Sequence, residues 1–211
     1  MPPDARRRLQ AVSRQIFRVW ALPAVLFAVV IFAERNPAVP RTPAIAPSDP
    51  EVAPDHAVLH VTEFVDFECP ACRYSARELD RFMTRHPGVV DLRCVILMSS
   101  CRHDVGRVPA QDVCLAARVG AVMQNRHLFW PYYKAVMLSD RVVDETLVWE
   151  TVGRLVGKDQ VAAVRTELDQ PAANAVLQGN IDFAAGKKID QTPSWIINDR
   201  LEVGAKTESS W

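Results

Sequence analysis

The stretch Ala57-Val-Leu-His-Val-Thr-Glu-Phe-Val-Asp-Phe-Glu-Cys69-Pro-Ala-Cys72 decides the fold of this chain. Residues 57–67 are apolar and β-branched, which is typical of a strand, and apolar residues recur with helical spacing over about 70–85. A Cys-x-x-Cys pair therefore falls where a strand meets a helix. Unpaired N–H groups at a helix start stabilise negative charge on the first sulfur, and the second cysteine can resolve a mixed disulfide. We interpret the pair as redox-active; half a zinc site and an inert disulfide are the alternatives.

The segments after this motif predict a strand–helix–strand unit, a set of helices and a closing hairpin. A second strand is expected at about 89–97, and such a unit implies parallel pairing through a right-handed crossover. Residues 193–197 and 201–203 are predicted to form two further strands, which a turn joins into a hairpin. Between these strands the pattern predicts helices at about 110–124, 126–138, 144–156, 158–169 and 171–185.

The charge of the chain is balanced overall but uneven along its length. The 211 residues include 25 Lys and Arg against 25 Asp and Glu, which argues against nucleic acid as a partner. Residues 1–18 hold five arginines and one aspartate, a net charge of +4, so the remainder carries −4.

The N-terminal region predicts a membrane anchor and a tether. Residues 19–33 are fifteen uncharged, mostly apolar residues, and residues 34–56 are rich in proline without hydrophobic periodicity. We expect 1–18 to be a basic cytoplasmic tail, 19–33 an uncleaved signal anchor and 34–56 a semi-rigid tether. A cleaved signal peptide and a buried helix are the alternatives for 19–33. Either membrane interpretation places the remaining domain outside the cytoplasm, where disulfides persist.

Three segments resemble the DsbA-like branch of the thioredoxin superfamily. They are Glu63–Cys72, Leu128–Tyr133 and Thr192–Asn198, and membrane-anchored bacterial thiol–disulfide oxidoreductases look most similar. The resemblance implies an α/β, thioredoxin-like fold over 57–211 with a helical insertion at about 99–188. It also implies a single-pass protein of the bacterial cell membrane with an extracytoplasmic (periplasmic or extracellular) domain.

The resemblance assigns roles to the two cysteines and to a distant proline loop. It makes Cys69 the attacking cysteine and Cys72 the resolving one. Thr192-Pro193 matches the cis-proline loop of the family, which lies beside the dithiol and binds extended substrate backbone. Position alone does not predict a cis bond, because few X–Pro bonds in folded proteins are cis.

A buried carboxyl is also expected beside the dithiol. Family members often carry an acid six residues before the first cysteine, which corresponds to Glu63 here. Strand alternation places Glu63 on the same face as two apolar residues, so we expect it to point inward and to accept the proton of the resolving cysteine. Asp66 and Glu68 are the alternatives.

The three other cysteines have less specific predictions. Some family members carry a second cysteine pair in the region of Cys101 and Cys114, so we expect a structural disulfide there. A second redox pair and two free thiols are the alternatives. Cys94 lies in an apolar strand and is predicted to be a buried small hydrophobe.

Taken together, the sequence predicts an extracytoplasmic enzyme that exchanges disulfides with protein substrates without a bound cofactor. A membrane redox partner would reset the dithiol, and the direction of electron flow is not given by the residues. The alternatives are a copper- or zinc-handling protein that uses the Cys-x-x-Cys pair and a non-catalytic binding module. Only seven residues follow Gly204, too few for the helix that usually closes this fold.

Overall fold

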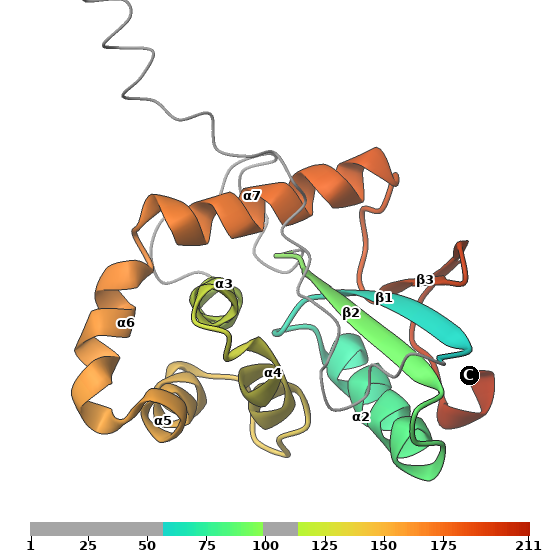
Figure 1. Ribbon diagram of the computed structural model, residues 1–211, viewed down its shortest axis with the longest axis horizontal. Coiled ribbons are helices and arrows are strands. Elements are labelled where there is room, and N and C mark those ends of the chain that lie inside the picture. The colour runs from blue at the N-terminus through green and yellow to red at the C-terminus, as the bar shows by residue number, and fades with distance from the viewer. Residues whose placement is uncertain (1–56, 99–113) are drawn as a thin grey trace, which may run out of the picture. The chain divides into compact units, whose positions relative to one another are not determined.

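A four-stranded sheet organises the computed structural model, which describes residues 57–98 and 114–211 (Figure 1). The strands are β1 (Leu59–Val65), β2 (Val90–Ile96), β3 (Ser194–Ile197) and β4 (Arg200–Val203). Their order is β2-β1-β3-β4, with β1 parallel to β2 and the other two pairs antiparallel. The predicted parallel pair and closing hairpin are thereby confirmed.

Both faces of β1 are covered, because its side chains alternate between two apolar clusters. Val61 and Val65 join the large cluster that includes α2 (Pro70–Arg85), whereas Phe64 packs in a second cluster with Val95 and Ala184. Glu63 lies between Cys94 on β2 and Trp195 on β3, residue against residue. The centre of the sheet therefore brings one carboxyl into the interior.

The helix α2 starts at the predicted place because Pro70 suits the first helical turn, where a missing N–H costs nothing. It buries Cys72, Leu79 and Met83 on one face. Its end at His86 precedes Gly88, whose φ of 81° is the left-handed conformation that glycine tolerates. The turn then leads directly into β2.

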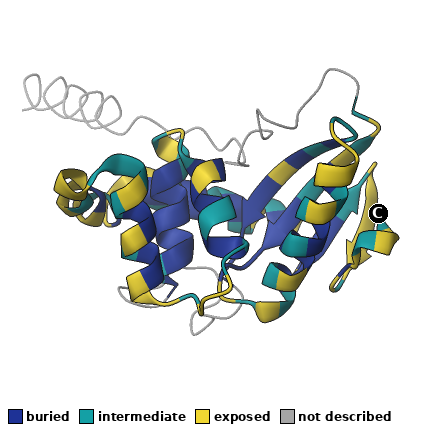
Figure 2. Cartoon of the chain, turned by 90° about the horizontal axis from the view of Figure 1, so that it is seen from below, coloured by how far each residue is buried: buried dark blue, intermediate teal, exposed yellow. Residues whose placement is uncertain are grey.

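The inserted helices agree with the sequence pattern to within a few residues where they are described. They are α3 (Leu115–Asn125), α4 (Phe129–Met137), α5 (Glu145–Val156), the 3-10 helix η2 (Lys158–Gln160), α6 (Val161–Glu167) and α7 (Pro171–Gly186). Figure 1 shows α7 running from the insertion to the sheet, and it contacts both α3 and β2. Figure 2 shows buried residues along the strands and on the inner faces of the helices.

The residues after Gly204, which were predicted to be too few for a closing helix, form a short packed tail. The 3-10 helix η3 (Glu208–Ser210) lies beside α2, where the backbone N–H of Lys206 donates to Ser75 Oγ at 2.9 Å. The backbone N–H of Glu208 donates to a carboxylate oxygen of Glu78 on the same helix. The ring of Trp211 meets Trp195 edge to face, with centroids 4.9 Å apart.

The predicted tail 1–18, anchor 19–33 and tether 34–56 lie outside the described residues. Among the residues that are described, no helix combines the length and apolar character that a membrane span requires.

Candidate active site

The two cysteines of the motif occupy different environments at the start of α2. Cys69 is the residue before the first helical turn, with φ −78° and ψ 118°, and is half-buried. Its N–H donates to the carbonyl of Asp66, and its own carbonyl accepts the N–H of Arg73, each at 3.1 Å. Cys72 is completely buried one turn later, and both thiols are free. The pair thus combines a reachable sulfur with a hidden one.

The proline loop lies against the reachable sulfur. The Thr192–Pro193 peptide bond is cis, as the family resemblance implied, and Cys69 Sγ lies 3.8 Å from the carbonyl oxygen of Thr192 as a donor. The loop is fixed on both sides, because Ser194 Oγ donates to the carbonyl of Gln191 and Gly204 N–H donates to that of Pro193. Residues 123 positions apart therefore meet at the dithiol.

Glu63 is completely buried and makes one strong hydrogen bond. Tyr133 Oη donates to Glu63 Oε2 at 2.5 Å, and Glu63 Oε1 has no hydrogen-bond partner among the residues that the structure describes. Burial raises the pKa of this carboxyl from 4.5 to about 8, and the bond from Tyr133 acts in the opposite direction. The inward orientation expected from strand alternation is what the structure shows.

Cys72 and Cys94 lie close enough to Glu63 for their charges to interact. Burial raises the pKa of the Cys72 thiol, the charges of Cys69 and Glu63 raise it further, and a backbone hydrogen bond from Asp66 opposes the rise. Burial likewise raises the pKa of Cys94, with smaller contributions from Glu63 and Cys72. Cys94 is buried as predicted, but it also belongs to this polar cluster.

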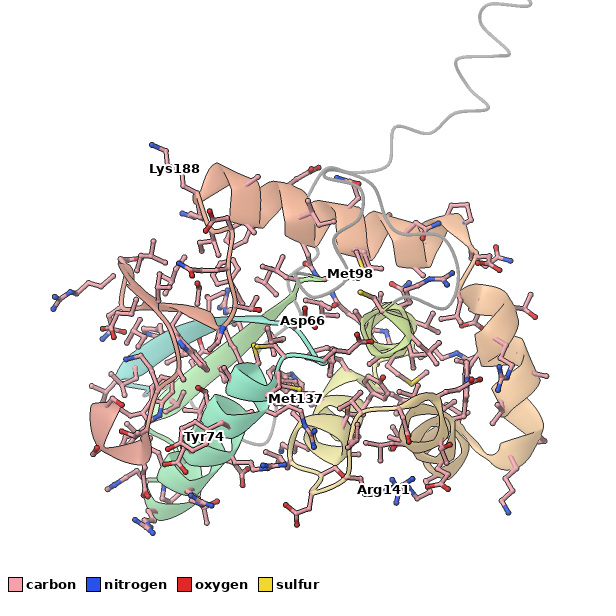
Figure 3. The ribbon with its side chains drawn as sticks, turned by 180° about the vertical axis from the view of Figure 1, so that it is seen from behind. Asp66, Tyr74, Met98, Met137, Arg141 and Lys188 are labelled. Carbon is pink, nitrogen blue, oxygen red and sulfur yellow. The ribbon has the colours of Figure 1, made fainter. Side chains whose placement is uncertain are left out.

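The two alternative acids occupy other positions. Asp66 is buried at the end of β1, where the sheet meets the insertion (Figure 3), and its Oδ1 accepts the backbone N–H of Glu68 at 2.9 Å. Glu68 is exposed; partial burial raises the pKa of its carboxyl, and the charge of Asp66 raises it further. Asp66 thus shapes the turn that leads into Cys69.

A cleft of about 420 Å³ lies on the insertion, and neither cysteine of the motif lines it. Glu68, the residue before Cys69, is one of its lining residues, and the Arg165 guanidinium stacks over the Trp149 ring at 3.9 Å in its wall. Its other walls come from α3, α5 and α6 and the residues around them: Leu115, Ala116, Arg118, Val143, Asp144, Glu145, Val148, Leu168 and Asp169.

Only one cysteine of the second predicted pair lies among the residues that the structure describes. Cys114 is buried where α3 begins and is disulfide-bonded, whereas Cys101 lies outside the described residues, so the pairing of the two stays a prediction. The described segments, 57–98 and 114–211, contain no group of three His, Cys, Asp or Glu side chains arranged to hold a metal ion.

Sequence reasoning missed Tyr133 as a member of the site. The residue belongs to the Leu128–Tyr133 motif, to which the family resemblance assigned no role, and its ring is buried. The spacing between Glu63 and Tyr133 carries no local signal, because 70 residues separate them. The family motif indicated that this segment is part of the fold, but it did not indicate that Tyr133 contacts Glu63.

One curated relative matches much of the chain. It is the Na(+)/H(+) antiporter NhaA of Herminiimonas arsenicoxydans, 28% identical over 158 residues, which are 73% of this chain and 24% of the relative. The chain thus spans about a quarter of the length of that protein.

Solved structures share the fold at low sequence identity. α-DsbA2 of Wolbachia pipientis, a thiol-disulfide exchange protein, has a TM-score of 0.55 at 14% identity, with 78% of this chain and 82% of that chain covered. BdbD of Bacillus subtilis has a TM-score of 0.55 at 18% identity, covering 79% and 86%. A periplasmic thioredoxin-like protein of Salmonella enterica serovar Typhimurium has a TM-score of 0.51 at 18% identity, covering 82% and 88%.

These structures bear out the DsbA-like fold that the three sequence motifs implied. The model of the family described as thioredoxin matches residues 53–211, about three quarters of the sequence. The chain therefore belongs to the thioredoxin family.

Proposed function

We propose that this protein is an extracytoplasmic thiol–disulfide oxidoreductase that acts on protein substrates through Cys69 and Cys72. The observation that carries the proposal is the asymmetry of the two thiols. The reachable sulfur of Cys69 stands at a helix start beside the Thr192 carbonyl, whereas Cys72 is hidden beside a buried carboxyl. This arrangement suits one cysteine that attacks a substrate and one that resolves the product.

In the reducing direction, the Cys69 thiolate attacks one sulfur of a substrate disulfide. A Cys69–substrate bond forms, the substrate disulfide breaks, and one substrate thiolate leaves. Cys72 gives its proton to Glu63 and attacks Cys69, which forms the Cys69–Cys72 disulfide and releases the second substrate thiolate. Two electrons pass from the enzyme to the substrate, and the same steps in reverse oxidise a substrate dithiol.

Glu63 is suited to both directions because burial raises its pKa to about 8, so that both its protonated and its ionised form are accessible near neutral pH. In the reducing direction its carboxylate accepts the Cys72 proton. In the oxidising direction its protonated form returns a proton to the departing Cys72 thiolate. The direction of electron flow therefore depends on the reduction potential of the Cys69–Cys72 pair relative to its substrates. A difference of about 30 mV corresponds to roughly 1.4 kcal/mol.

Substrate backbone is proposed to lie along the Thr192–Pro193 loop, next to Cys69. The Thr192 carbonyl already faces the sulfur at 3.8 Å, so an extended peptide beside it would present its own disulfide to Cys69. No resident cofactor is needed, since the two sulfurs carry the electrons. A membrane redox partner would return the dithiol to its starting state.

A pair of serine variants tests this function. In the full-length chain, Cys72→Ser is expected to accumulate a mixed disulfide with a model protein substrate, because nothing resolves the Cys69–substrate bond. Cys69→Ser, the matched control, should trap no substrate. Trapping through Cys72 in the Cys69→Ser variant would reverse the two roles. Stoichiometric copper or zinc in the purified wild-type chain, without disulfide exchange, would favour the metal-handling alternative instead.

The location outside the cytoplasm is a separate proposal, supported by the arginines before the apolar residues 19–33. The Salmonella protein with this fold is described as periplasmic. A phosphatase that is active only outside the cytoplasm, fused after residue 211, should be active and fractionate with membranes. A soluble product that starts near residue 47 would show that cleavage occurs, and an inactive fusion would overturn the topology.

A further inference from the structure

Tyr133 is the one hydrogen-bond donor that reaches the Glu63 carboxyl in the described part of the chain. The tyrosine comes from α4, in the insertion, whereas Glu63 lies on the central strand β1. The bond from Tyr133 Oη to Glu63 Oε2 is 2.5 Å long and fully enclosed, since both side chains are buried. The other oxygen, Oε1, accepts no hydrogen bond from any described residue.

The groups around Glu63 come from four elements and include no described cation. Cys72 faces it from α2, Cys94 from β2 and Tyr133 from α4, while β3 contributes Trp195, which does not titrate. The described salt bridges do not involve Glu63, and its protonation is governed by burial and by the Tyr133 bond. A charged Glu63 therefore depends on Tyr133 for its polar contact.

The tyrosine ring is held in place on several sides. It lies edge to face against Phe67 at 6.2 Å and Trp130 at 5.4 Å, and tilted against Phe129 at 5.9 Å between centroids. Such packing fixes the ring and with it the direction of the hydroxyl. The packing thus fixes the position of the hydroxyl oxygen relative to the Glu63 carboxyl.

We propose that Tyr133 is a positioning residue for the exchange reaction: it fixes one carboxyl oxygen of Glu63, favours the ionised form, and leaves Oε1 available to exchange a proton with Cys72. This role rests on the proposed function above. It assigns to the helical insertion a direct part in the chemistry of the dithiol. The step itself is a proton transfer between the Cys72 thiol and the Glu63 carboxylate, with no other group consumed.

Tyr133→Phe removes the donor and keeps the ring. A hydrogen bond to a carboxylate lowers its pKa by about one to two units. Without the Tyr133 hydroxyl, the pKa of Glu63 should therefore rise by that amount from about 8. The rise can be followed by difference infrared titration of the protonated carboxyl band that Glu63→Gln abolishes. The pH midpoint of the resolving step, measured in single turnover with a model disulfide, should move up by the same amount.

Tyr132→Phe is the matched control. Tyr132 is the neighbouring residue on α4 and is equally buried, but its hydroxyl donates to the backbone carbonyl of Ala116 at 2.8 Å instead of to Glu63. It should leave both the titration of Glu63 and the pH midpoint unchanged. In a Glu63→Gln background, Tyr133→Phe should no longer shift the pH midpoint.

Three outcomes would overturn the role of Tyr133. They are an unchanged Glu63 titration in Tyr133→Phe, an equal shift in Tyr132→Phe, and a shift that persists in the Glu63→Gln background. The infrared titration needs no activity, so it separates this inference from the proposed function. A wild-type chain that performs no disulfide exchange would refute the proposed function, whereas an active wild type without the shift would refute only the role of Tyr133.

Discussion

Glu63→Gln is expected to make the protein more stable at high pH, because the wild-type carboxyl is buried with little compensation. Gln is nearly the same size and keeps a carbonyl oxygen that can accept the Tyr133 hydroxyl. It cannot ionise, however, so it removes the cost of charging this position. The variant therefore isolates the contribution of one buried carboxyl to stability.

The sign and size of the effect follow from linkage. The unfolded chain releases the Glu63 proton near pH 4.5, whereas the folded chain retains it until about pH 8. Between these values the folded state binds more protons, so its stability falls as the pH rises. The full difference corresponds to about 5 kcal/mol, and most of it, about 3–4 kcal/mol, develops between pH 5 and pH 8. This is a large share of the typical 5–15 kcal/mol of a folded domain.

The assay is urea unfolding of the full-length wild type and Glu63→Gln, in mild detergent and in the same redox state, at unit steps from pH 5 to pH 8. Cys72 and Cys94, whose pKa values the charge of Glu63 raises, stay protonated in both folded proteins over this range, so the difference in unfolding free energy reports Glu63. That difference should move steadily in favour of Gln as the pH rises. A difference that stays flat across this range would show that the carboxyl is not held protonated by burial, and the reasoning would fail.

Three further substitutions test the packing around the site. Gly120→Ala places a Cβ 3.1 Å from the Phe67 ring, so despite the better helix propensity it should lower the unfolding free energy by about 1–2 kcal/mol; a raised melting temperature would contradict this. Asp144→Ala removes the side-chain cap of α5 and should cost about 1 kcal/mol in urea unfolding, where an unchanged midpoint would argue against a capping role. Trp211→Ala loses the edge-to-face contact with Trp195 and should cost at least about 1 kcal/mol; equal stability would mean that the tail does not hold this end of the sheet.

The parts of the site that sequence could predict are those set by local geometry. Cys69 and Cys72 fall at a strand–helix junction, and a proline at the first helical position fixes where the helix begins. Strand alternation was enough to predict that Glu63 points inward, because alternate residues of a strand lie on the same face and the neighbours of Glu63 on that face are apolar. The cis form of Pro193 came from family resemblance and not from local preference.

The parts that could not be predicted depend on contacts between distant segments. The bond between Tyr133 and Glu63 exists because α4 packs against the strand–helix junction, and nothing in the spacing encodes that approach. Cys94 was predicted to be an ordinary core residue. Its position beside Glu63 depends on the register in which β1 pairs with β2, which the sequence does not give. The packing of the C-terminal tail was not predicted, because a 3-10 turn and a single aromatic contact have no periodic sequence pattern.

The helical insertion meets the active-site helix at the surface as well as in the core. The guanidinium groups of Arg73 and Arg77 on α2 both donate to the carbonyl of Ser139, just after α4, and Arg73 also donates to the carbonyl of Arg141 (labelled in Figure 3) at 2.5 Å. These contacts begin one turn after Cys69, on the helix whose first turn holds both sulfurs. Since Tyr133 of α4 donates a hydrogen bond to Glu63 in the interior, the insertion contacts both the proposed base and the helix that begins at the dithiol. A change in how α4 packs should therefore alter the redox chemistry of Cys69 and Cys72, even though α4 itself contains no cysteine.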